Sequence, residues 1–229
     1  MPQSPRCPEV LEQLRSLADP ANVEGMAHFG INPHNTLGVS VTDLRKIAKG
    51  LGMDHELAAQ LWESGIHEAR ILAVLVDDPK MVSLNQMESW VKDLDSWDVC
   101  DQLCSNLFNR TPRAYDRAVA WSSRPEEFVK RAGFVLMAAL AVHDKKAPDP
   151  RFFAFLPIIR REVTDDRNYV KKAVNWALRQ IGKRNHRLRE AAIDVAKAIQ
   201  LMDSKTARWI GSDTIKQLAR PAKKKRVVA

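Results

Sequence analysis

The chain has 229 residues, of which 45% are hydrophobic, and its formal net charge is +8. This length allows one large domain or two small ones with a sizeable core, and three cysteines do not suggest a disulfide framework. No apolar run approaches the roughly 18 residues of a membrane span, and the N-terminus lacks the apolar segment of a signal peptide. We therefore expect a cytoplasmic protein that does not enter the membrane.

The charge is distributed unevenly along the chain. Residues 1–150 carry a net charge of −5, whereas residues 151–229 carry +13. Such asymmetry indicates an anionic partner that is held mainly by the C-terminal part. The basic run 221–229 is expected to be a disordered tail. It could be a nuclear-localisation-like run or an extra phosphate contact, and we favour the phosphate contact.

Helical signals recur along the chain, and no segment alternates like a strand. Ser83 with Gln86 and Ser123 with Glu126 have the spacing of capping boxes. Thr111-Pro112 and Asp149-Pro150 resemble the starts of further helices. Apolar residues then recur at helical spacing in 128–139 and 170–181.

Weak internal repeats accompany these helices. The segments 67–73, 128–134 and 169–175 resemble one another, and the cations Arg131 and Lys172 within them are 41 residues apart. A period of about 40 residues is typical of HEAT or armadillo helix pairs, which stack into a solenoid. We therefore predict an all-α solenoid over residues 1–220 as a single domain. An ordinary helical bundle is the alternative.

Trp97 and Asp101 are four residues apart in Ser96-Trp97-Asp98-Val99-Cys100-Asp101. On a helix they would lie on one face, about one turn apart. Asp98 fits an acid that meets the positive end of the helix dipole. Trp97 could equally be a core residue, so the spacing alone leaves both a structural and a functional role open.

Arg131 lies near the start of the next apolar helix. It could form a salt bridge between repeats, for example with Asp101, or it could hold a phosphate through both guanidinium nitrogens. The spacing does not distinguish these two roles.

One helix face carries a cationic stripe with an aromatic residue inside it, formed by Lys172, Trp176, Arg179 and Lys183. Lys171 lies next to this stripe. This chemistry binds a nucleic-acid backbone and packs on a sugar or base. A carboxylate such as Asp101 is unexpected near that surface, because it repels phosphate. Its presence there would suggest a function that requires the negative charge. The remaining indoles, Trp62, Trp90, Trp121 and Trp209, we interpret as packing residues.

Several kinds of site are not indicated. The sequence has neither a glycine-rich phosphate loop nor a His-Glu-x-x-His motif, and its six histidines are scattered. We expect neither a metal nor another cofactor.

Taken together, these motifs resemble those of the bacterial AlkD-like DNA glycosylases, the HEAT-like-repeat DNA alkylation repair proteins. The Trp-Asp-x-x-Asp element resembles 97–101, the arginine followed by alanine resembles Arg131-Ala132, and the Lys-Ala-x-x-Trp-x-Leu-Arg helix resembles 172–179. Near the N-terminus, 24–27 and 37–39 resemble the segment that leads into a helix with Leu44-Arg45. Gly133 and Ala139 depart from the larger or basic residues expected there, which would change a phosphate contact.

The resemblance implies a right-handed α-solenoid of HEAT-like helix pairs with a concave DNA-binding face. It also implies a glycosylase that releases cationic alkylated purines, such as 3-methyladenine and 7-methylguanine, from double-stranded DNA. Asp101, Trp97 and Arg131 would be the catalytic residues, and Trp176, Arg179, Lys172, Lys171 and Lys183 would bind DNA. We expect a monomer that associates with the nucleoid.

Two other functions fit parts of the pattern. A non-catalytic HEAT-repeat protein that binds distorted or branched DNA would keep the cations without depending on Asp101. A protein-interaction scaffold would explain the repeats but not the C-terminal charge.

Overall fold

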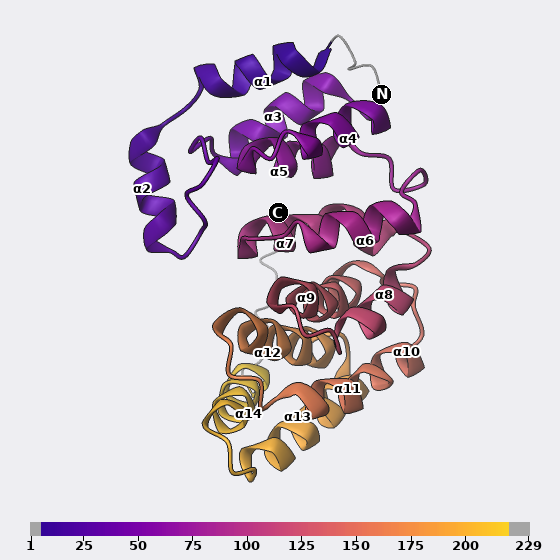
Figure 1. Ribbon diagram of the computed structural model, residues 1–229. Coiled ribbons are helices and arrows are strands. Elements are labelled where there is room, and N and C mark those ends of the chain that lie inside the picture. The colour runs from indigo at the N-terminus through magenta and orange to yellow at the C-terminus, as the bar shows by residue number, and fades with distance from the viewer. Residues whose placement is uncertain (1–5, 220–229) are drawn as a thin grey trace, which may run out of the picture. The chain divides into compact units, whose positions relative to one another are not determined.

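The computed structural model describes residues 6–219, and every regular element within them is helical (Figure 1). The all-α prediction is confirmed. The chain divides into two compact units, Met1–Leu136 and Met137–Ala229, and the single domain over 1–220 stays a prediction. The basic tail lies outside the described residues. Among residues 6–219, none of the helices has the length and apolar character that crossing a bilayer requires.

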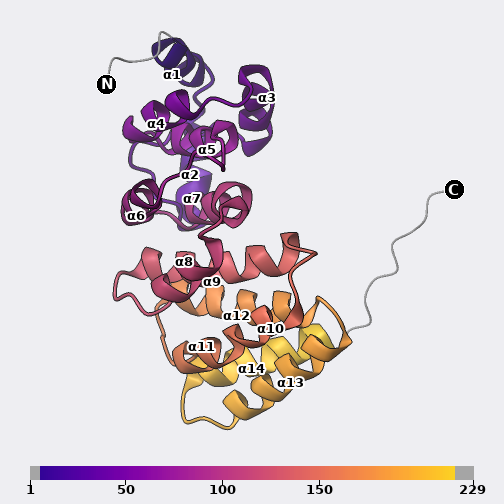
Figure 2. The ribbon, with the colours of Figure 1, turned by 90° about the vertical axis from the view of Figure 1, so that its right-hand side faces the viewer.

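The first unit is built from short helices, several of them stacked in pairs such as α4 with α5 (Figures 1 and 2). They are α1 (Arg6–Ser16), α2 (Pro20–His28), α3 (Val41–Leu51), α4 (His55–Glu63), α5 (His67–Val76), α6 (Leu84–Lys92), α7 (Trp97–Gln102) and α8 (Ala114–Trp121). A π-helical turn, η1 (Leu103–Leu107), and a 3-10 turn, η2 (Phe108–Arg110), follow α7. The long α9 (Glu127–His143) crosses the boundary between the units.

The second unit contains longer amphipathic helices. After α10 (Asp149–Phe153) and α11 (Phe155–Glu162) come α12 (Asn168–Gly182), α13 (His186–Gln200) and α14 (Lys205–Leu218). The last two form a tightly packed pair, and both also pack against α12 (Figure 2). Buried residues recur every three or four positions, for example Val170, Ala173, Val174 and Ala177 of α12, as an amphipathic helix requires.

The predicted helix starts are confirmed in part. Ser83 caps α6, because its hydroxyl accepts a hydrogen bond from the Gln86 amide. The side chain of Gln86 reaches Asp77 instead of completing the box. The second box is wrong: the Ser123 hydroxyl donates to the Ala120 carbonyl, and Glu126 pairs with Arg124.

Successive helices are joined by buried indoles and polar links of similar sequence separation. Trp62 and Trp90 stack with ring centroids 4.2 Å apart. The Trp62 indole donates to Asp93, 31 residues later, and the Trp121 indole donates to Glu88, 33 residues earlier. These three tryptophans are packing residues, as predicted. Trp209 is not, because 43% of its surface is exposed.

Gly133 allows α9 to approach the end of α8 closely. A Cβ atom at this position would lie 2.6 Å from the Ser122 backbone nitrogen, and no real Cβ makes such a contact. Ala139, further along α9, is fully buried. Both departures from the family pattern therefore have a packing reason, and the expectation that they alter a phosphate contact stays a prediction.

Candidate active site

α7 presents Trp97 and Asp101 one turn apart, as their spacing predicts. Ser96 precedes the helix in an extended conformation, with φ −141° and ψ 143°. Both side chains are half-buried, whereas Val99 and Cys100 between them face the core. The π-helical turn η1 begins two residues after Asp101. Single π-turns are frequent at functional sites, because they widen a helix locally and re-aim its side chains.

Arg131 forms an ion pair with Asp101. Its Nη2 atom lies 2.7 Å from Asp101 Oδ1. The exposed fractions of the two side chains are 6% for Arg131 and 22% for Asp101. Of the two roles that the sequence left open, the salt bridge is the one observed. The phosphate-clamp role stays a prediction, and in this structure the guanidinium is engaged by Asp101.

The environment of Asp101 favours its neutral form. Burial raises the pKa of this carboxyl, the Arg131 charge and hydrogen bond oppose that rise, and nearby Asp98 adds to it, so that the pKa reaches about 6. A carboxyl with that pKa is about nine-tenths ionised at pH 7. Asp101 is therefore a charged but weakly solvated anion at neutral pH, with part of its surface open to solvent.

The Trp97 indole is fixed by the segment that follows α2. Its Nε1 atom donates to the Phe29 carbonyl over 3.2 Å. Asn32 donates to Asp95 just before α7. Further along the segment, the buried Glu68 carboxylate accepts the amide hydrogens of Leu37 and Gly38 at 2.8 and 2.7 Å. The segment that the resemblance singled out at 37–39 is thus tied to the body of the first unit.

Asp98 has a second role besides meeting the helix dipole. It accepts a hydrogen bond from the Ser96 hydroxyl at 2.6 Å and lies 2.8 Å from His67 Nε2. Burial alone would lower the pKa of His67, but the hydrogen bond and charge of Asp98 outweigh burial and raise it. Burial would raise the pKa of Asp98, and the bonds from His67 and Ser96 lower it. The pair holds α7 against α5, and nothing local in the sequence indicated a contact across 31 residues.

The cationic stripe of the second unit lies on the accessible side of α12. Lys172 and Lys183 are exposed, and Lys171, Trp176 and Arg179 are half-buried. This agrees with a stripe that faces away from the apolar side of its own helix. The position of the stripe on this side of α12 is as predicted, and its DNA-binding role stays a prediction.

A carboxylate on α14 adjoins this stripe. Asp213 lies 3.0 Å from Arg179 Nη1 and accepts a hydrogen bond of 2.8 Å from the buried Asn175 amide. Burial, and then the charge of Arg179, lower the pKa of Lys183. Arg179 is thus oriented by a neighbouring helix, which the sequence did not reveal.

The chain is similar in sequence to two curated proteins and similar in fold to a solved structure. The chain is 24% identical over 191 residues to the uncharacterized protein Lin0241 of Listeria innocua and 22% identical to the uncharacterized protein Lmo0209 of Listeria monocytogenes, with 82% of this chain and 83% of each relative covered. A solved structure matches with a TM-score of 0.77 and 19% identity over 92% of this chain and 94% of its own. It is described as "a new family of proteins related to the HEAT-like repeat DNA glycosylases with affinity for branched DNA structures".

That structural likeness confirms the predicted HEAT-like repeat fold. The model of a protein family described as "DNA alkylation repair enzyme" matches residues 10–218, which is most of the chain. The protein therefore belongs to the DNA alkylation repair enzyme family.

Proposed function

We propose that this protein is a DNA glycosylase that hydrolyses the N-glycosidic bond of cationic alkylated purines, of the 3-methyladenine and 7-methylguanine type, in duplex DNA. The observation that carries the proposal is the Asp101 carboxylate. It is partly exposed, its pKa is raised by burial to about 6, and an indole lies one turn before it. Perturbed carboxyls of this kind cluster at functional sites.

Release of a cationic base requires a carboxylate but no second residue that acts as a general acid. An alkylated purine already carries a positive charge, so it leaves as a neutral base without being protonated. The C1′–N9 electron pair departs with the base, the oxygen of a water molecule bonds to C1′, and the proton released from that water passes to Asp101 or to solvent. The transition state develops positive charge on the deoxyribose, as in glycoside hydrolysis generally.

A fixed anion close to that sugar would lower the barrier. A unit charge pair about 4 Å apart at an effective dielectric near 20 is worth about 4 kcal/mol. This corresponds to at most about a thousandfold in rate, because the ground-state base is also cationic. The poor solvation of Asp101 favours such an interaction, since fewer water molecules must be displaced from it.

The other residues have supporting roles in this proposal. Arg131 positions Asp101 and lowers its pKa relative to burial alone. Trp97 offers the electron-rich face of its indole to the sugar cation. Lys171, Lys172, Trp176, Arg179 and Lys183 of the second unit bind the DNA backbone. We expect the protein to act as a monomer on nucleoid DNA.

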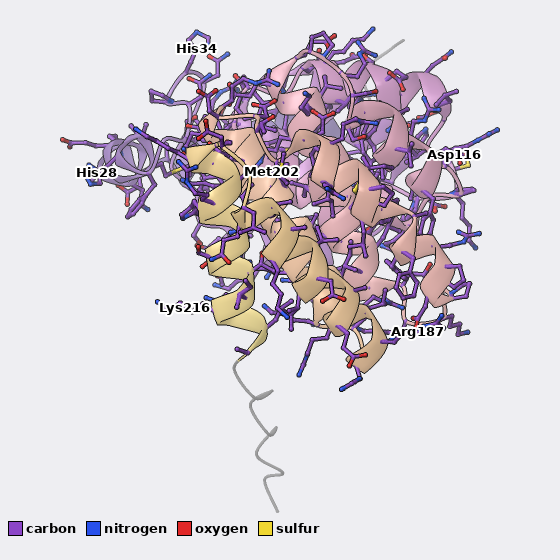
Figure 3. All side chains as sticks on the ribbon, turned by 90° about the horizontal axis from the view of Figure 1, so that it is seen from below. His28, His34, Asp116, Arg187, Met202 and Lys216 are labelled. Atoms are coloured by element: carbon purple, nitrogen blue, oxygen red, sulfur yellow. The ribbon has the colours of Figure 1, made fainter. Side chains whose placement is uncertain are left out.

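The test is release of 7-methylguanine from a methylated duplex under single-turnover conditions. We expect wild type to release the base, Asp101→Asn to bind the duplex but lose most of the release, and Asp116→Asn to behave as wild type. Asp116 is an exposed acid on α8 of the same unit, so it controls for the loss of a negative charge (Figure 3). Equal release by wild type and Asp101→Asn would refute the catalytic role.

A second candidate function is non-catalytic binding of branched DNA. Two observations favour it: the solved relative described by its affinity for branched DNA structures, and the Arg131–Asp101 ion pair, which also serves as a structural link between helices. In this case neither wild type nor variant would release a base, and both would bind a four-way junction more tightly than a duplex of equal length.

A further inference from the structure

Trp209 is an exposed indole that does not pack in the hydrophobic core. The buried face of α14 consists of Ala207, Ile210, Gly211, Thr214 and Leu218. At about 100° per residue, Trp209 points away from that face, and 43% of its surface is exposed. Its interpretation as a packing residue was wrong, because α14 is the last described helix and no further repeat covers this side within residues 6–219.

Trp209 lies on the side of α14 that adjoins α12. Asp213, one turn later, accepts hydrogen bonds from Asn175 and Arg179 of α12. Further on, Gly182 of α12 lies against Leu218. Later residues of α12 therefore contact later residues of α14. The two helices run side by side in the same direction.

This alignment places Trp209 level with the first two turns of α12. Asp213 is opposite Asn175 and Arg179, so the position one turn earlier on α14 is opposite residues 171–175, which include Lys171 and Lys172. Lys172 is exposed. The indole is therefore a neighbour of the predicted DNA-binding stripe and not an isolated surface residue.

Cations of α14 itself lie near the indole. Lys205 and Lys216, about one turn before and two turns after Trp209, are both exposed, and Lys216 extends away from the neighbouring helices (Figure 3). The one acid of α14 itself, Asp213, is engaged by Arg179 and Asn175. An aromatic face beside exposed cations matches an anionic ligand with planar groups, and nucleic acid has that chemistry.

We propose that Trp209 stacks on an unpaired nucleotide base next to the strand held by α12. This inference rests on the proposed DNA-binding role of the α12 stripe. The bases of an intact duplex are stacked inside it, so an indole on the outer surface of α14 meets only sugars and phosphates there. A base that has left the stack offers a free π-face, and stacking such a base on an aromatic side chain is favourable for any sequence.

Two probes distinguish the two situations. One is a fluorescein-labelled duplex, and the other is the same duplex with a short central run of unpaired thymidines on one strand. We expect Trp209→Ala to weaken binding of the looped probe roughly 5- to 100-fold and binding of the intact duplex by less than about twofold. Trp209→Phe should retain most of the affinity for the looped probe, since it keeps an aromatic face.

Leu201→Ala is the matched control. This residue is 89% exposed in the turn between α13 and α14, so its truncation removes apolar surface from the same unit without touching α12. It should leave both affinities unchanged. Thermal unfolding of each variant, followed by circular dichroism, checks that the fold is kept.

Lys172→Ala separates failure of this inference from failure of the proposed function. If Lys172→Ala weakens both probes and Trp209→Ala weakens neither, the stacking role is wrong and the DNA-binding stripe stands. Equal losses by Trp209→Ala on both probes would overturn the preference for an unpaired base. If neither variant changes binding of either probe, both the stacking role and the stripe are refuted.

Discussion

Replacing Asp101 by asparagine should stabilise the folded protein while it removes catalysis. The pKa of Asp101 rises from 3.8 to about 6 on folding. A pKa difference of one corresponds to about 1.4 kcal/mol, so keeping this carboxylate ionised costs the folded state about 3 kcal/mol. Asparagine has nearly the same shape and no charge to desolvate, and it therefore avoids this cost.

The sign and the pH window follow from the direction in which the pKa moves. Between pH 4 and 6 the unfolded chain has lost the Asp101 proton and the folded protein has kept it, so stability falls as pH rises. The advantage of Asp101→Asn should be about 3 kcal/mol at pH 7.5 and about half of that at pH 5. At neutral pH this corresponds to an increase in Tm of roughly 6 to 12 °C for a chain of this size.

Urea unfolding at pH 5 and 7.5 measures this difference, with Asp116→Asn as the control. The opposite result is equally informative. If Asp101→Asn is less stable than wild type by about 3–5 kcal/mol at pH 7.5, the Arg131–Asp101 ion pair is a net stabilising link whose loss leaves a buried guanidinium unpaired. Asp101 would then have a structural role. Keeping it ionised in the folded protein would not lower stability, so its burial would need no functional explanation.

Three further predictions concern activity, binding and packing. The excision rate should rise about tenfold per pH unit below pH 6 and level off above it, because only ionised Asp101 acts; a flat profile from pH 5 to 7 would contradict this. Lys172→Ala and Arg179→Ala should each reduce the salt-dependence slope of duplex binding by about one, measured by fluorescence anisotropy; unchanged slopes would exclude the α12 stripe. Gly133→Ala should lower the free energy of unfolding in urea by about 1–3 kcal/mol, because its Cβ would clash with backbone beyond α8. Gly25→Ala, a helical position with nothing within 4 Å of the added Cβ, should lack this loss.

The features that the sequence predicted correctly are local ones. Apolar periodicity within one helix identified the buried side of α12, and a serine three residues before Gln86 identified the start of α6. Trp97 and Asp101 lie on one side of α7 because their spacing of four matches one helical turn.

What the sequence did not reveal depends on partners far along the chain. Arg131 had two equally good interpretations until its contact with Asp101, 30 residues earlier, was seen. The buried pair of His67 and Asp98 gave no local signal for the same reason. Trp209 was misassigned because it was grouped with the other indoles by residue type, whereas it lies away from the buried positions of α14.

The similar sequence separations of the polar links have a consequence for folding. In the first unit, the links from Trp62, His67 and Arg131 each span 30 or 31 residues. Each helix thus depends on its immediate neighbours, which gives a low contact order and allows structure to propagate from any well-formed pair. Opening should then be graded, as native-state hydrogen exchange reports it. Every residue of α2 is exposed or half-buried, so its amides should exchange far ahead of those in α5. Local opening of α2 would break the hydrogen bond from the Trp97 indole to the Phe29 carbonyl, while α7 and Asp101 stay folded.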